Sequence, residues 1–142
     1  MKNTLFMILI IILIVLAVVS GFVINNQKEM KITANANREI EQYTEREIKG
    51  SELMTLINKV SDYNEKKEVQ KDDKNRYIEN NDNSIKIEVK FLESDDTYDM
   101  EAISKLGSEA FIKNYNSMVF ECIKKEYHKS KGQIKYMLFK QK

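Results

Sequence analysis

The pattern of apolar and polar residues divides the chain sharply near its N-terminus. From Leu5 to Ile24 every residue is apolar except one serine and one glycine, and no charged residue stands between Lys2 and Lys28. At a helical rise of about 1.5 Å per residue, this run reaches roughly 30 Å, the thickness of the hydrocarbon core of a bilayer. Apolar side chains cover every face of such a helix. The pattern therefore predicts a transmembrane anchor over residues 1–24.

A cleaved signal peptide is the alternative explanation of this run. Signal peptides have an apolar core of about 7 to 15 residues that ends at a small-residue cleavage site. The Val-Val-Ser segment at 18–20 resembles such a site, but Phe22, Val23 and Ile24 carry the apolar run beyond it. We therefore expect an uncleaved, single-pass anchor.

The flanks of the run bear on its orientation. The N-terminal flank carries Lys2 and no acid, while Lys28, Lys31 and Arg38 follow the run. A bare count of basic residues would place the second flank in the cytoplasm. A short basic tail before a long remainder, as in a signal sequence, favours the opposite orientation. We expect a cell-membrane protein with a cytoplasmic N-terminus and an extracytoplasmic C-terminal domain.

A narrower apolar stripe continues beyond the predicted anchor. Ile32, Ala36, Ile40 and Tyr43 follow one another at intervals of four, four and three residues, as in a coiled-coil seam. We predict a juxtamembrane amphipathic stalk over residues 25–49. The stripe covers either the chain's own domain or the stalk of a neighbouring subunit. In the second case Ile32, Ile40 and Tyr43 belong to a partner surface.

The remaining residues, 50–142, combine apolar stripes at helical spacing with stretches of strand-like alternation. The predicted elements are a helix at 52–63, a polar loop at 62–75, a hairpin of strands 76–79 and 84–92, a helix at 98–115 with Gly107 tolerated inside it, and a hairpin of strands 118–127 and 133–141. Each apolar stripe needs another apolar face to cover it. We therefore predict an α+β extracytoplasmic domain with a four-stranded antiparallel sheet and both helices on one face.

Composition excludes several classes of function. Lys and Arg number 23 against 22 Asp and Glu, which gives a net charge of +1, so nucleic acid is not an expected partner. The single cysteine, Cys122, excludes an intramolecular disulfide and is expected to be a structural thiol on a strand. The only histidine, His128, falls in a Lys-rich turn. There we expect it to be exposed and without a catalytic role.

Motifs for ligands and metals are lacking. The acid-rich stretches at 72–73, 80–83 and 95–96 do not have the alternating oxygen ligands, central glycine and final glutamate of a calcium-binding loop. The chain has four glycines and contains neither a phosphate-binding glycine motif nor a His-Glu-x-x-His motif. The sequence therefore predicts no cofactor, no metal site and no catalytic residue, and we expect a protein that is not an enzyme.

Bulky residues gather in the last predicted strand, at Tyr136, Met137, Leu138 and Phe139. They alternate between the two faces of the strand, so a sheet that is covered on one side leaves one pair exposed. We predict a partner surface here. The alternative is a central strand whose second face is covered by the stalk helix.

A long apolar helix that leads through a stalk into a small α+β domain resembles the layout of pilin-like proteins. Type IV prepilins carry a Gly-Phe cleavage site before the apolar run, whereas here Gly21-Phe22 ends the run and the first acid is Glu29. Residues 48–60, 83–89 and 126–128 resemble segments of uncharacterised small membrane-anchored proteins of low-GC Gram-positive bacteria. Some of those are encoded near tight-adherence (Flp-type) pilus genes. The resemblance implies a bacterial membrane protein with a pilus association, and it brings no catalytic residues.

Two functions of different classes are consistent with these features. A structural or accessory component of a pilus-like or secretion assembly would use the anchor and stalk to pack beside similar helices, and the domain to contact protein partners. A membrane-tethered binding or sensing module would need a pocket and would act through a partner in the membrane. We expect the first function. Membrane lipid and other proteins, including further copies of the chain, are the expected partners.

Overall fold

The computed structural model describes residues 2–142, without the side chains of residues 2, 3 and 5. It divides into two units, one up to Asn35 and the other from Ala36 to Lys142. Helix α1 (Lys2–Thr44) begins in the first unit and ends in the second.

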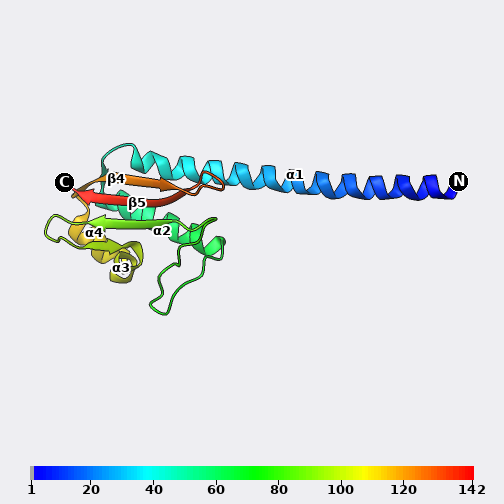
Figure 1. Ribbon diagram of the computed structural model, residues 1–142. Helices are drawn as coiled ribbons and strands as arrows, with labels where there is room; N and C mark the ends of the chain where they lie inside the picture. Colours follow the sequence, from blue (N-terminus) through cyan, green and yellow to red (C-terminus); the bar gives the residue numbers. More distant parts are fainter. Residues whose placement is uncertain (1) are drawn as a thin grey trace. The chain divides into compact units, whose positions relative to one another are not determined.

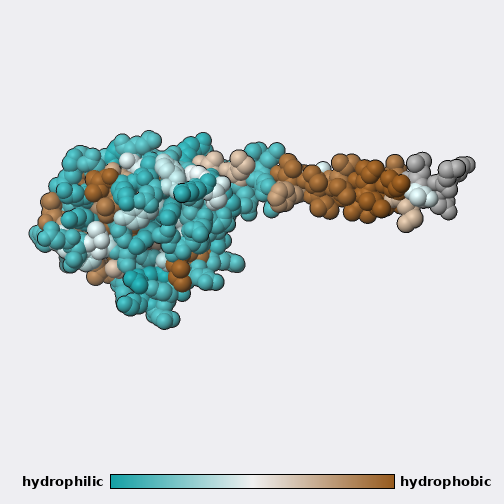
Figure 2. Space-filling model, in the orientation of Figure 1, coloured by the Kyte–Doolittle hydropathy of each residue, from teal (hydrophilic) through white to brown (hydrophobic). Residues whose placement is uncertain are grey.

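In the first unit, α1 contains residues 2–24 of the predicted anchor, and Met1 lies outside the described residues. Its large apolar side chains from Phe6 to Ile24 are 41 to 68% exposed, and its most apolar stretch has a mean hydropathy of 3.4 with none of it buried. Figure 2 shows this part of α1 as a continuous hydrophobic surface. Within the described residues, α1 is the one helix that is long and apolar enough to cross a membrane.

The second unit is built on a mixed five-stranded sheet with the strand order β1-β4-β5-β2-β3. The strands are β1 (Ile48–Lys49), β2 (Lys86–Lys90), β3 (Thr97–Asp99), β4 (Val119–Tyr127) and β5 (Ile134–Gln141). Strand β5 lies between β4 and β2 (Figure 1), and it pairs antiparallel with β4 but parallel with β2. The fold is α+β as predicted, but the prediction of a four-stranded antiparallel sheet is wrong.

The predicted hairpin around residues 80–83 does not form. Tyr77 makes an isolated bridge with Lys71, and β2 pairs with β3 and β5 instead. The alternation within β2 specifies which side chains face the core, but it does not specify the neighbouring strand. A parallel partner requires a long crossover connection, and the segment between β2 and β5 contains β3, two helices and β4.

The helices of this unit are α2 (Gly50–Lys66), α3 (Met100–Leu106) and α4 (Ser108–Tyr115). The single helix predicted at 98–115 is therefore two helices. Gly107 separates them because its φ of 86° is incompatible with a continuous helix. The Asp99 side chain begins α3 by accepting a hydrogen bond of 2.8 Å from the Ala102 amide.

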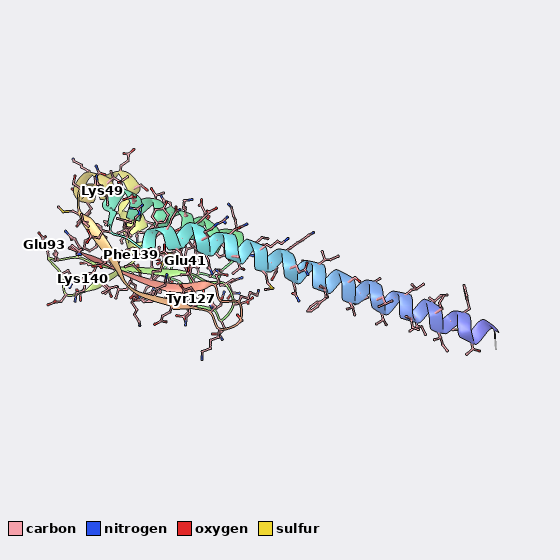
Figure 3. The ribbon with its side chains drawn as sticks, turned by 90° about the horizontal axis from the view of Figure 1, so that it is seen from above. Glu41, Lys49, Glu93, Tyr127, Phe139 and Lys140 are labelled. Atoms are coloured by element: carbon pink, nitrogen blue, oxygen red, sulfur yellow. The ribbon has the colours of Figure 1, made fainter. Side chains whose placement is uncertain are left out.

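The helices of this unit cover one face of the sheet, and no helix among its residues, 36–142, covers the other face (Figure 3). The core lies between them. The sheet contributes Ile87 and Val89 from β2 and Met137 and Phe139 from β5, all fully buried. The last turns of α1 complete the core with Ile40, which is 4% exposed. The second face of the sheet, which carries polar side chains, is the first candidate site.

Candidate functional sites: the open sheet face and a polar cleft

The residues predicted to form a partner surface fall into different environments. Three are buried in the domain core: Ile40, Met137 and Phe139. Two are half-buried and lie on the uncovered face: Tyr136 and Leu138. Tyr43 packs partly against the core, and Ile32, in the first unit, is 51% exposed. Because core residues do not reach a partner, only Tyr136 and Leu138 of the four residues predicted on β5 are available to one.

The uncovered face of the sheet, here called the open face, has its side chains in three rows across β4, β5 and β2. The rows are Glu126–Tyr136–Lys86 (tyrosine row), Lys124–Leu138–Glu88 (leucine row) and Glu121–Lys140–Lys90 (lysine row). In every row the charge on β4 is opposite to the charge on β2. Apolar contact is offered by Leu138 and by Ile123, which is 51% exposed at an irregularity in β4.

Polar contacts hold the centre of the open face in place. The Tyr136 hydroxyl donates to Glu88 Oε2 at 2.7 Å, and Lys86 Nζ lies 2.7 Å from Glu88 Oε1. On the other side Lys124 Nζ lies 2.7 Å from Glu126 Oε1 and 5.4 Å from the centre of the Tyr136 ring. These contacts order the charged side chains before any partner binds.

These contacts also shift the pKa values of the open face. Burial and the hydrogen bond to the Glu88 carboxylate raise the pKa of Tyr136. Burial alone would raise the pKa of Glu88, but hydrogen bonds from Lys86 and Tyr136 outweigh it and lower that pKa. The hydrogen bond from Lys124 lowers the pKa of Glu126. The carboxylates are therefore charged at neutral pH, and the face presents fixed charges of both signs.

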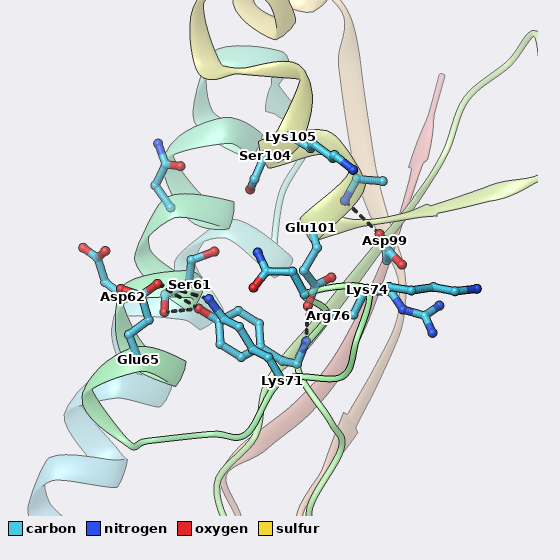
Figure 4. Close-up of a pocket in the computed structure, with 14 residues that line it drawn as sticks. Ser61, Asp62, Glu65, Lys71, Lys74, Arg76, Asp99, Glu101, Ser104 and Lys105 are labelled. Carbon is cyan, nitrogen blue, oxygen red and sulfur yellow. Dashed lines mark hydrogen bonds and ion pairs between the residues drawn. The ribbon is translucent and has the colours of Figure 1, made fainter.

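A polar cleft of about 590 Å³ opens between α2, the loop after it and α3 (Figure 4). Tyr77 joins its walls. The Tyr77 amide donates to Glu101 Oε1 at 3.0 Å, and its hydroxyl lies 3.2 Å from the Ser61 carbonyl oxygen and 3.3 Å from Glu65 Oε1. Lys71 Nζ lies 4.5 Å from the centre of the Tyr77 ring and 3.4 Å from Glu65. Burial raises the pKa of the Tyr77 hydroxyl, which therefore stays protonated at neutral pH.

Asp72 shapes the loop wall of the cleft. Its Oδ1 accepts from the amides of Lys74 and Arg76 at 2.9 Å each, and its Oδ2 accepts from the Arg76 guanidinium at 2.9 and 2.8 Å. The Arg76 amide and then its guanidinium lower the pKa of Asp72. The cleft is lined by acids and bases in equal number, namely Asp62, Glu65, Asp99 and Glu101 with Lys71, Lys74, Arg76 and Lys105. It suits a small polar ligand with charges of both signs.

His128 is not the exposed turn residue that the sequence predicts. It is 3% exposed, and its Nε2 lies 2.7 Å from the Ser84 carbonyl oxygen. A carbonyl oxygen only accepts, so Nε2 carries the proton of this hydrogen bond. The residues around His128 look polar in sequence, and only a contact across 44 positions of the chain buries it. Its role is to hold the turn before β5 against the start of β2.

The cleft residues were not predicted as a site from the sequence. Their one local signal is Tyr77, the only aromatic residue between Tyr63 and Phe91. The open face had a stronger signal, because charged residues alternate with apolar ones in residues 84–92. That pattern predicts a half-buried strand but not the rows, which depend on the pairing of β2 with β5.

Comparison of the chain with protein-family models, with curated proteins and with solved structures gave no match. The class of this protein is therefore described by its own fold and sequence. It has an α+β domain preceded by an apolar helix that is long enough to cross a membrane.

Proposed function

We propose that this protein is a bacterial, non-catalytic, membrane-anchored accessory component of a pilus-like or secretion assembly, with its α+β domain outside the cytoplasm. Helix α1 carries the proposal. It exposes apolar side chains around its whole circumference from Phe6 to Ile24, and its last turns belong to the domain core through Ile40. Because the apolar side chains of residues 6–24 are exposed, this part of α1 needs lipid or other apolar helices around it. The proposed anchor and the start of the domain thus belong to the same helix, α1.

The domain would contact protein partners through the open face and the exposed part of the stalk. The open face has ordered charges of both signs around Leu138, and the stalk exposes Ile32. Mixed charges around a small apolar centre favour a specific protein partner over a polyanion.

Cysteine labelling tests the orientation. In a Cys122→Ser background, Lys131→Cys places a thiol on the exposed turn before β5. A membrane-impermeant maleimide should label it in intact cells. Labelling only after lysis would overturn the extracytoplasmic placement, and a cytoplasmic cysteine protein labelled in parallel reports cell integrity. The intact mass of the purified protein shows whether residues 1–24 are retained.

Crosslinking followed by mass spectrometry on native membranes tests the assembly role. We expect crosslinks from the protein to a pilin-like or secretion-system protein, and fewer of them in an Ile32→Glu variant, because a charge replaces an exposed apolar side chain of the stalk. Ile112→Glu, on the exposed side of α4, is the matched control. Recovery of the protein without any such partner would contradict the proposal.

The polar cleft favours a second candidate function, a membrane-tethered binding or sensing module that acts through a partner in the membrane. A small zwitterion bound there would raise the midpoint of thermal unfolding in proportion to its affinity. Amino acids and short peptides are the probes for such a shift. A Ser104→Trp variant, which places a bulky ring in the cleft, should abolish it. The absence of a shift with all these probes would favour the assembly role.

A further inference from the structure

We propose that the open face is the interface of a homodimer whose twofold axis runs along β5. In this arrangement two copies stack sheet against sheet, and both copies use the same surface. A twofold axis along β5 places each row against the same row of the other copy, with its two ends exchanged. Each β4 residue therefore lies opposite the β2 residue of its own row.

The charges of the open face match this axis. Glu126 of one copy lies opposite Lys86 of the other in the tyrosine row. Lys124 lies opposite Glu88 in the leucine row, and Glu121 lies opposite Lys90 in the lysine row. All of these pairs are of opposite charge. Such complementarity gives an interface its register and orientation.

The alternative axis, perpendicular to the strands, exchanges the tyrosine and lysine rows. Glu126 would then lie opposite Glu121, and Lys86 opposite Lys90. In the leucine row Lys124 and Glu88 would each meet their own copies. Like charges would face one another at every charged position of β4 and β2 in these rows, which disfavours this arrangement. The charge pattern therefore selects one of the two axes that keep the strands of the stacked sheets aligned.

The centre of the proposed interface is apolar. Leu138 lies on the axis and meets its own copy, with Tyr136 beside it in the next row. Lys140 also lies on the axis and meets its own copy, and Glu121, which flanks it in the same row of each copy, offsets this like-charge contact. The edge of β4 beyond its short pairing with β1 is a poorer site for a second copy, because register shifts in the pairing of β4 with β5, at Cys122/Lys124 and at Glu126/Tyr127, make the strand irregular there.

An axis along β5 is also compatible with two copies anchored in one membrane. This compatibility rests on the proposed anchor. The last turns of α1 run alongside β5 in the same direction. Asn37 accepts from the Ile134 amide at 2.9 Å at the start of β5, and Glu47, just past α1, pairs with Lys142 after its end. An axis along β5 therefore leaves Ala36 of both copies at the same end of the dimer. The perpendicular axis would place them at opposite ends.

The open face is only three strands wide, so we expect an interface below the usual size of about 800 Å² per partner. Such a dimer is weak between freely diffusing molecules. Confinement to a membrane raises the local concentration of the chains and favours it. The test therefore uses the full chain in its native membrane.

Site-specific crosslinking tests the dimer. Two differently tagged full-length copies are co-expressed with Cys122→Ser and Leu138→Cys, and membranes are treated with a thiol-to-thiol reagent shorter than the roughly 10 Å spacing of packed sheets. We expect a crosslinked product that contains both tags. Lys113→Cys, on the exposed side of α4, is the control and should give at least fivefold less product. The proposal would be overturned by equal yields at both positions or by no product at Leu138→Cys. A product that contains one tag and a foreign protein would also overturn it.

Charge reversal tests the register independently. Glu121→Lys alone sets lysine against Lys90 at two symmetric places, and Lys90→Glu alone sets glutamate against Glu121. Each should lower the crosslinking yield about fivefold, and the double variant should restore it. If the double variant did not restore the yield, the proposal that the twofold axis runs along β5 would be wrong. Carbonate extraction of the same membranes reports the anchor separately, so a failed dimer and a failed membrane assignment give different results.

Discussion

The close packing of Gly50 against the end of α4 leaves no room for a side chain. A Cβ on Gly50 would lie 2.0 Å from the carbonyl oxygen of Tyr115 and 2.6 Å from its carbonyl carbon. We expect Gly50→Ala to destabilise the domain by at least about 1 to 3 kcal/mol, because backbone atoms would have to move apart. Thermal unfolding of the full chain in detergent measures this. Gly21→Ala, whose Cβ meets nothing within 4 Å, should leave the domain midpoint unchanged.

Asn64 is a second residue whose importance the sequence does not reveal. It is fully buried on α2, where its amide donates to the Ile85 carbonyl oxygen at 2.8 Å and accepts from the Ile85 amide at 3.0 Å. Asn64→Ala would leave both backbone groups of Ile85 without these partners, so we expect a loss of about 2 to 4 kcal/mol. Asn58→Ala, exposed on the same helix, should change stability by less than about 0.5 kcal/mol. Similar unfolding midpoints for the two variants would contradict this role.

For single residues, the sequence predicts the burial of apolar side chains but not the burial of polar ones. Buried apolar positions such as Ile87, Val89 and Phe120 follow from the alternation of the strands. The burial of His128 and Asn64 does not, because both are polar and their partners lie 44 and 21 positions away. The same limit applies to Tyr77, since its place in the cleft depends on Glu101, 24 positions later.

At the scale of elements, the existence of the helices and of the long strands could be predicted, but their pairing could not. The periodicity over 52–63 and over 84–92 is a local property and predicts α2 and β2. The parallel pairing of β2 with β5 is decided by the whole crossover between them. The split of the helix predicted at 98–115 was also missed, because a glycine within a helical pattern is compatible with both outcomes until its φ is known.

The loop that walls the cleft provides a prediction about pH. The hydrogen bonds from Arg76 lower the pKa of Asp72 in the folded chain, so their stabilising effect is present above the ordinary aspartate pKa of about 3.9. It is lost as the pH falls through the lower, folded value. An NMR titration of the Asp72 carboxyl carbon should show this depressed midpoint, and Arg76→Gln should raise it. An unchanged midpoint in Arg76→Gln would show that the ion pair is not formed in solution.

At the scale of the whole molecule, the apolar helix was the most predictable feature, since its length and composition suffice to identify it. The open face was the least predictable feature. Its side chains come from β4, β5 and β2, and only the observed strand order brings them into rows of opposite charge. A surface that depends on long-range pairing cannot be found from local pattern alone.

Charged side chains in the middle of the apolar segment of α1 should prevent its insertion into a membrane. Replacement of Ile14 and Val15 by arginine places two charges in the middle of the apolar segment, each at a cost of about 2.5 to 3.5 kcal/mol for insertion into a bilayer. We expect this variant to leave the carbonate-resistant membrane fraction. Arginine at Ile32 and Met30, on the same helix but outside the segment, is the matched control and should leave the protein in that fraction. If both variants stayed in the membrane pellet, the segment would not be the anchor. If the wild-type protein were released with residues 1–24 missing from its intact mass, the segment would be a cleaved signal.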